Sequence, residues 1–175
     1  NTNLVRNAVL KGLLNRILDE KANIVNAVAI AEARGIRIEE TRAQRTQFAD
    51  SIRVALKSND HESSAEGTVL HGSEPRLLAF DNINVECPLD GTLVVLKNLD
   101  VPGVIGRIGT LLGKREINIA NFSLGRERRP RGKQASEPVG AVCVVQVDGK
   151  VPSTVIKELS KIPANTFART VELGS

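Results

Sequence analysis

The chain has 175 residues, of which 41% are hydrophobic, and a formal net charge of +4 at pH 7. The sequence contains four Phe and no Trp, Tyr or Met, so a buried core must consist of aliphatic side chains. No apolar run reaches the ~18 residues that a membrane span needs and no secretion signal is recognisable, so we expect a cytoplasmic protein without membrane contact.

The N-terminal part of the chain predicts two helices followed by strands. Apolar residues three and four apart predict an amphipathic helix up to Leu18, and a second helix is expected over residues 22–34, ended by Gly35. Alternating apolar and charged residues predict a strand over residues 36–41. Residues 51–58 and 64–70 are expected to pair across a turn at 59–62. That turn holds His61, for which we expect solvent exposure, and neither His61 nor His71 has a neighbour that indicates catalysis.

A domain boundary is predicted at the segment CPLDG, residues 87–91, because it combines a strand breaker with a turn dipeptide. The length of the chain fits two small domains better than one large domain. We therefore expect a first domain over residues 1–88 and a second over residues 91–175.

The second domain has the pattern of a βαββαβ unit. Strands are expected over residues 93–97, 117–123, 139–147 and 167–173. Helices are expected from near Pro102, with Val104, Ile108 and Leu112 on one face, and over residues 151–159.

The loop before the Pro102 helix is the candidate binding site. A helix start presents unpaired N–H groups that receive a carboxylate, and Asp100 could accept bonds from an ammonium group, which together suit an amino acid zwitterion. The alternative is that Asp100 only caps the helix.

Four glycines follow in this segment. A ligand approaching closely would explain Gly103 and Gly106, whereas tight packing of the helix on the sheet would explain Gly109 and Gly113. Their GxxGxxG spacing differs from the GxGxxG of a dinucleotide fingerprint, so we reject a Rossmann site.

Other classes of site have little support in the sequence. Cys87 and Cys143 are isolated, so we expect no metal site and no disulfide framework, and place both thiols in the core. Five basic residues close together form a loop that we interpret as a solvated hairpin tip and not a nucleic-acid contact, because no aromatic side chain accompanies them. These residues are Arg126, Arg128, Arg129, Arg131 and Lys133. We find no catalytic set and expect that the chain by itself is not an enzyme.

At the segment LDVPGVIGRIGTLLGKREINIANFSLGR the chain resembles an ACT domain. Upstream, VLKGLLNRIL at residues 9–18 and IVNAVAIAEARGIRIEETRA at residues 24–43 resemble an intervening domain. The whole length resembles the C-terminal regulatory region of a bacterial D-3-phosphoglycerate dehydrogenase.

The resemblance implies an α+β fold: a ferredoxin-like βαββαβ ACT domain preceded by a smaller helix-plus-antiparallel-sheet domain. It further implies that L-serine or a related amino acid binds between the ACT domains of a homo-oligomer, a dimer or tetramer, for feedback control of serine biosynthesis. NAD would belong to the catalytic part of the parent enzyme and not to this fragment. The effector-binding residues carried over are Asn98, Asp100, Val101, Pro102, Gly103, Val104, Ile105 and Asn118, the last from the neighbouring copy, and Arg76 is a candidate anion-binding residue.

Two alternatives remain open. The chain could be the accessory domain of an L-serine dehydratase, although the cysteines of an iron–sulfur cluster are not present in it. It could also be a purely structural oligomerisation module. Under the sensing interpretation, the effector binds the assembled state better than the separated one and shifts the population towards it.

Overall fold

The computed structural model describes residues 2–18, 21–41, 51–59, 61–129 and 137–173. The chain divides into two compact units, Asn1–Phe48 and Ala49–Ser175. The predicted boundary at residues 87–91 lies inside the second unit, where the chain passes from one sheet to the next, and as a domain boundary it stays a prediction. Among the described helices, none has the length and apolar character that crossing a membrane requires.

The first unit contains helices α1 (Thr2–Leu14) and α2 (Ala27–Ala33). The predicted second helix begins five residues later than expected, because Asn23 and Asn26 hold the intervening backbone in a turn. Asn23 Oδ1 accepts bonds from the amides of Val25, at 2.8 Å, and Asn26, at 2.9 Å, and such local bonds compete with helix formation. Gly35 has a φ of 72° and ends the helix as predicted.

The strand predicted over residues 36–41 is wrong: this described segment has no regular structure and no sheet partner. Its alternation has a different cause, because Ile36 and Ile38 pack against the small core between α1 and α2. That core consists of Leu10, Leu14, Ala22, Ala27 and Ala31.

The second unit begins with an antiparallel sheet in the order β1-β2-β3-β4. Its strands are β1 (Ser51–Ser58), β2 (His61–Leu70), β3 (Glu74–Phe80) and β4 (Ile83–Pro88). The predicted pairing of these two segments is confirmed, but β2 begins at His61, so residues 61 and 62 of the predicted turn belong to the strand. Strands β3 and β4 were not predicted. Asp81 and Asn82 join β3 to β4 with φ of 47° and 64°, the positive values that a two-residue hairpin turn requires.

The second sheet completes the predicted βαββαβ unit. Its elements are β5 (Thr92–Leu99), α3 (Val104–Lys114), β6 (Ile119–Arg126), β7 (Gly140–Val147), α4 (Ser153–Ser160) and β8 (Asn165–Glu172). The antiparallel order β6-β7-β5-β8 confirms the ferredoxin-like topology, since the first and third strands of the unit lie together in the centre. Helix α3 begins at Val104, two residues after the predicted start at Pro102.

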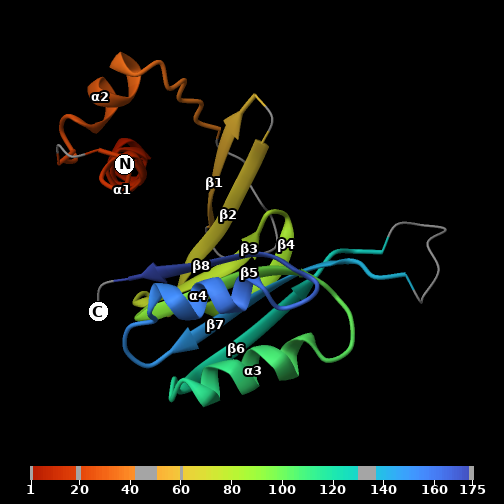
Figure 1. The fold of residues 1–175 in the computed structure, drawn as a ribbon. Helices are drawn as coiled ribbons and strands as arrows, with labels where there is room; N and C mark the ends of the chain where they lie inside the picture. The colour runs from red at the N-terminus through yellow and green to blue at the C-terminus, as the bar shows by residue number, and fades with distance from the viewer. Residues whose placement is uncertain (1, 19–20, 42–50, 60, 130–136, 174–175) are drawn as a thin grey trace. The chain divides into compact units, whose positions relative to one another are not determined.

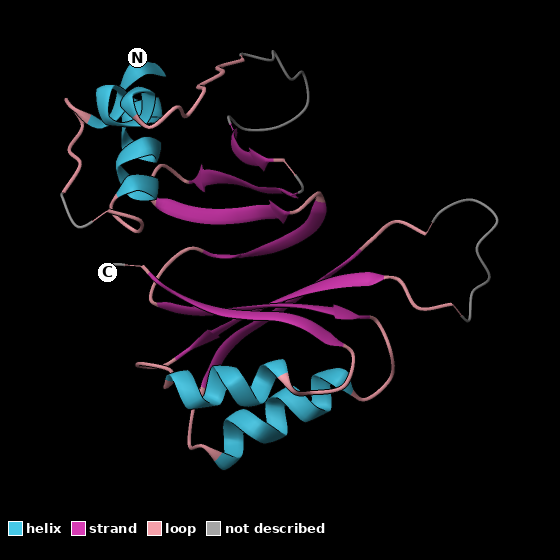
Figure 2. Cartoon of the chain, turned by 45° about the horizontal axis from the view of Figure 1, so that its top comes forward, coloured by secondary structure: helices cyan, strands magenta, loops and turns pink. Residues whose placement is uncertain are grey.

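The second unit has three layers, which Figures 1 and 2 show as two sheets and a pair of helices. Helices α3 and α4 cover one face of the β5–β8 sheet, through Val94, Leu96 and Ile108 among others. The opposite face packs against the β1–β4 sheet, through Val85, Val95 and Val144 among others. Both faces of the central sheet are therefore buried, as its almost uninterrupted apolar β5 and β7 require.

The expectation that Gly109 and Gly113 pack tightly on the sheet is wrong, because a Cβ added at either residue would meet nothing within 4 Å. The close approach occurs at Gly125 on β6. A Cβ there would lie 2.9 Å from Ile83 Cγ2, 3.0 Å from the backbone carbon of Asn84 and nearer still to its carbonyl oxygen. The two sheets are therefore in close contact where β4 passes over β6.

Lys97 on β5 also joins the two sheets. Its ammonium group pairs with Asp81 and lies 5.3 Å from the ring of Phe80 and 5.4 Å from the ring of Phe167. Burial alone would raise the pKa of Asp81, but bonds from Lys97, the Ser64 amide and Ser63 lower it more, so that its pKa lies below the usual value.

Candidate functional site

The loop between β5 and α3 is held in place by its own backbone. The amide of Leu99 donates to the Ala164 carbonyl at 2.9 Å, and the amide of Asp100 donates to the Val139 carbonyl at 2.8 Å. Pro102 and Gly103 then form a turn in which Gly103 has a φ of 89°, a conformation that suits glycine. The shape of the loop is thus set by bonds within the chain.

The start of α3 presents free donors. The amides of Gly103, Ile105 and Gly106 have no hydrogen-bond acceptor among the described residues. Such groups at a helix start carry a partial positive charge and favour an anionic oxygen. The Asp100 carboxylate accepts no bond from these amides, since the N-cap residue of α3 is Gly103 and no side chain forms a cap bond. The alternative in which Asp100 caps the helix is therefore wrong.

A pocket of about 240 Å³ lies at this loop. Its lining includes every residue of the loop predicted from the sequence, together with Leu124 and Arg126 of β6, which were not predicted as site residues. The lining residues are Asn98, Asp100, Val101, Pro102, Gly103, Val104, Ile105, Leu124 and Arg126. The structure therefore brings seven of the eight predicted effector-binding residues to one pocket.

Asp100 forms an ion pair with Arg126 in this pocket, with 3.0 Å between Oδ2 and Nε. The Asp100 side chain is 26% exposed and that of Arg126 is 61% exposed, so solvent reaches both groups. The sequence contained one signal for Arg126: it follows the inward-facing Leu124 by two residues, and residues two apart on a strand share a face.

Asn98 lines the pocket but uses its polar atoms within the chain. It is only 5% exposed, its Nδ2 donates to the Leu99 carbonyl at 2.8 Å, and its Oδ1 accepts from the Cys143 thiol at 3.5 Å. The side chain therefore stabilises the end of β5. Its contact with an effector stays a prediction.

Asn118 does not lie in the pocket. It precedes β6, whereas Arg126 ends that strand, and its Nδ2 donates to Asp148 Oδ2 at 2.7 Å. Within one copy, the structure does not bring Asn118 and Asp100 together. A contribution of Asn118 to this pocket requires a second copy of the chain.

Arg76, the candidate anion-binding residue, lies on β3. Its Nη2 is 3.2 Å from Glu86 Oε1, and its buried Nε has no hydrogen-bond partner. The guanidinium is thus partly neutralised by Glu86, and anion binding by Arg76 stays a prediction.

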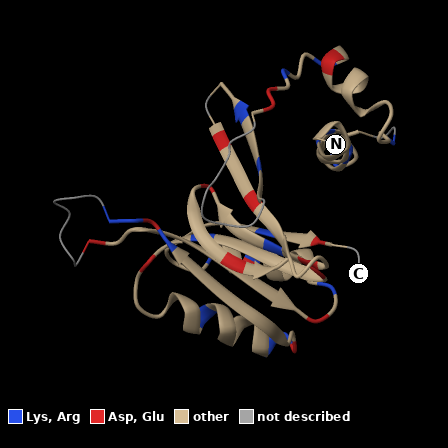
Figure 3. Ribbon diagram, turned by 180° about the vertical axis from the view of Figure 1, so that it is seen from behind, with Lys and Arg blue, Asp and Glu red and all other residues tan. Residues whose placement is uncertain are grey.

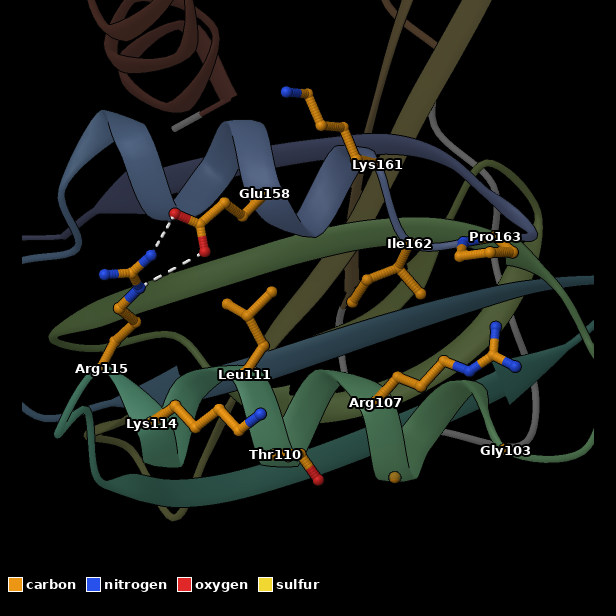
Figure 4. A pocket seen from close by; sticks show the side chains of 11 residues that line it. Gly103, Arg107, Thr110, Leu111, Lys114, Arg115, Glu158, Lys161, Ile162 and Pro163 are labelled. Atoms are coloured by element: carbon orange, nitrogen blue, oxygen red, sulfur yellow. Dashed lines mark hydrogen bonds and ion pairs between the residues drawn. The ribbon is translucent and has the colours of Figure 1, made fainter.

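A second, larger groove of about 980 Å³ lies between α3 and the segment that includes and follows α4 (Figure 4). Leu111 and Ile162 lie between basic side chains on its two sides, and Arg115 meets Glu158 through two contacts, at 2.5 and 3.3 Å. Basic residues recur along α3 (Figure 3), and Arg107, Lys114 and Arg115 line this groove. It shares only Gly103 and Gly106 with the residues that the sequence predicted to approach a ligand.

The chain also contains two cysteines and two histidines. Among the described residues, no three His, Cys, Asp or Glu side chains are placed to hold a metal ion. Cys87 and Cys143 are buried as expected, and burial raises the pKa of each thiol to about 11. His61 and His71 are exposed, at the start of β2 and in the turn that follows it. Of the predicted basic loop, Arg131 and Lys133 lie outside the described residues.

Comparison with known proteins agrees with this arrangement. The D-3-phosphoglycerate dehydrogenase intervening domain matches residues 1–81, and the ACT domain matches residues 92–164. The chain is 37% identical to the D-3-phosphoglycerate dehydrogenase of Archaeoglobus fulgidus over 175 residues, which are 99% of this chain and 32% of that protein. It is 33% identical to the D-3-phosphoglycerate dehydrogenase of Methanocaldococcus jannaschii over 162 residues, which are 93% of this chain and 29% of that protein.

A similar match joins the chain to the D-3-phosphoglycerate dehydrogenase of Synechocystis, with 33% identity over 167 residues, which are 95% of this chain and 29% of that protein. The chain thus spans about a third of the length of these relatives, and their range of organisms does not assign it to bacteria alone. The two matched domains, the relatives and the βαββαβ topology agree: the chain carries a D-3-phosphoglycerate dehydrogenase intervening domain followed by an ACT domain, and over nearly its whole length it is similar to one part of these dehydrogenases.

Proposed function

We propose that this chain is the regulatory part of a D-3-phosphoglycerate dehydrogenase and binds an amino acid effector, L-serine first, in the pocket between the β5–α3 loop and the end of β6. The observation that carries the proposal is the pocket itself. A carboxylate, a guanidinium and unpaired helix-start amides meet in a space of about 240 Å³.

The size of the pocket supports a small effector. Sites for drug-sized ligands commonly occupy roughly 300–1,000 Å³, and this pocket is smaller. Asp100 suits the ammonium group of an amino acid, and the amides of Gly103 and Ile105 suit its carboxylate. In the parent enzyme, feedback by L-serine would act on a catalytic part that binds NAD.

A second copy of the chain would complete the site. Strand β6 is an edge strand that pairs only with β7 among the described strands. If two β6 strands paired antiparallel about their middle, Asn118 of one copy would lie near the Arg126 end of the other. The effector would then contact both copies and favour the homo-oligomer.

The test is a calorimetric titration of L-serine, glycine and L-threonine into this chain and into its Asp100→Ala and Asn118→Ala variants. L-Serine is expected to release or absorb heat with the wild-type chain. Each substitution is expected to weaken its binding by about tenfold or more, because each removes a polar contact to the ligand. If none of the three amino acids binds the wild-type chain, the alternative of a purely structural oligomerisation module is the better account.

A further inference from the structure

Asp100 and Arg126 form an ion pair only with each other among the described residues. Arg126 meets Asp100 side-on, through Nε and Oδ2 at 3.0 Å. Within the part of the chain that the structure describes, neither side chain has a hydrogen bond or ion pair with a third residue. A carboxylate and a guanidinium with no other partner in the described ranges therefore lie side by side in the pocket.

These are also the only two charged side chains in the lining of the pocket. The lining therefore has one negative and one positive side chain, and its net charge is zero. An α-amino acid carries its ammonium and carboxylate on one carbon atom, so the two groups of a single ligand can be met by a carboxylate and a guanidinium that already touch.

The fold places Arg126 here through pairings between distant parts of the chain. Strand β7 lies between β5 and β6, and Arg126 pairs with Ala141 while the amide of Asp100 donates to Val139. The alternation of β6 directs Leu124 and Arg126 to the helix-covered face and Gly125 to the opposite one. Arg126 is thus held at the level of the loop by sheet register.

We propose that Arg126 determines the ligand class of this pocket: together with Asp100 it requires both an α-ammonium and an α-carboxylate group on the effector. The ammonium binds Asp100 at Oδ1, and the carboxylate binds the terminal nitrogens of Arg126, with its second oxygen near the free amides of Gly103 and Ile105. This inference rests on the proposed function, since it names what the pocket recognises in its effector.

A structural role alone is the competing account of Arg126. Its side chain is 61% exposed, and ion pairs between groups so open to solvent contribute little to folding. Replacement of Arg126 should therefore leave the fold intact, which separates an effect on binding from an effect on stability.

The experiment compares L-serine with two compounds that each lack one of its charged groups. Ethanolamine is L-serine without its carboxylate, and glycerate has a hydroxyl in place of the ammonium group. Binding of each compound is measured by NMR titration of the full chain and of Arg126→Gln. The matched control is Arg107→Gln, which removes the same charge from an exposed residue of α3 outside this pocket.

The wild-type chain is expected to bind L-serine at least tenfold more tightly than ethanolamine or glycerate. Arg126→Gln is expected to weaken the binding of L-serine by about 10- to 100-fold, because a charge-assisted hydrogen bond is lost. It is expected to change the affinity for ethanolamine by less than threefold. Arg107→Gln is expected to change the affinity for L-serine and for ethanolamine by no more than about threefold. Arg126→Lys keeps the charge but loses the planar pair of donors, so we expect a partial loss; it carries the test if the Gln variant does not fold.

The possible failures are distinguishable. Suppose that the wild-type chain binds L-serine, but Arg126→Gln weakens the binding of L-serine and of ethanolamine equally, or strengthens the binding of both because Asp100 is released. The assignment of Arg126 is then wrong and the proposed function stands. If the wild-type chain binds no L-serine, both the proposed function and the role of Arg126 are overturned.

Discussion

Substitution of Gly125 by alanine should destabilise the second unit, because the strand that carries Arg126 leaves no room for a side chain there. The new Cβ would lie 2.9 Å from Ile83 Cγ2 and 3.0 Å from the backbone carbon of Asn84, whereas ordinary contacts lie at 3.4–4 Å. Two of the obstructing atoms belong to the backbone of β4, so the sheets would have to separate by roughly half an ångström or more in a close-packed interior. Overpacking of this kind costs about 1–3 kcal/mol.

The matched control is Gly109→Ala on α3. A Cβ at Gly109 would meet nothing within 4 Å, and alanine in a helix interior is favoured over glycine by about 0.5–1 kcal/mol. The two substitutions add the same methyl group but should change the free energy of unfolding in opposite directions. Urea unfolding followed by far-UV circular dichroism measures both, since the chain contains no Trp or Tyr for fluorescence. If Gly125→Ala were as stable as Gly109→Ala, the close approach of β4 to β6 would be refuted.

Three further predictions concern the charges, the thiols and the assembly. Because the pKa of Asp81 is lowered in the folded state, its pairing with Lys97 stabilises the fold above the unfolded-state pKa near 3.8, and this stability is lost as the pH falls through the lower folded pKa. The difference in urea midpoint between wild type and Asp81→Asn should therefore be largest near pH 7 and shrink below pH ~4; a constant difference down to pH ~2.5 would contradict this. Native Cys87 and Cys143, with thiol pKa values raised to about 11, should react with a thiol reagent at pH 8 at least tenfold more slowly than in urea, and equal rates would show that the thiols are not buried. L-Serine should increase self-association in sedimentation equilibrium, and no such increase should occur with Asn118→Ala; an equal increase with that variant would place the ligand away from Asn118.

The second half of the fold was predictable because its signals are local. Apolar runs at β5 and β7, the polar loop at Asp100 and the helical period of α3 each lie within one short segment, so the βαββαβ order follows from the sequence alone. The start of α3 differed by two residues because the αL conformation of Gly103 ends the turn before the helix begins.

The errors arise where a pattern has more than one physical cause. Ile36 and Ile38 alternate with charged residues as in a strand, but they cover a helical core and no strand lies beside them. The β3–β4 hairpin was missed although Asp81 and Asn82 lie between two alternating runs, because an Asp-Asn pair is a weaker turn signal than Asn-Gly.

The part of the site that sequence reasoning missed depends on contacts between distant residues. Asp100 was identified from its own loop, whereas Arg126 joins it only because β7 pairs with β6 while Val139, the residue before β7, accepts the bond from the Asp100 amide. The two-residue spacing places Arg126 on the same face as Leu124, but nothing in that segment indicates Asp100 as its partner. The absence of Asn118 from the pocket likewise follows from the length of β6, which separates it from Arg126.

The most direct test of the central claim is to locate bound L-serine by amide chemical shifts of the ¹⁵N-labelled chain. We expect the largest changes at Val101, Gly103, Val104 and Ile105, with a further change at Asn118 as the second copy associates. Changes confined to the groove around Lys114 and Lys161, or no change at saturating L-serine, would contradict the account.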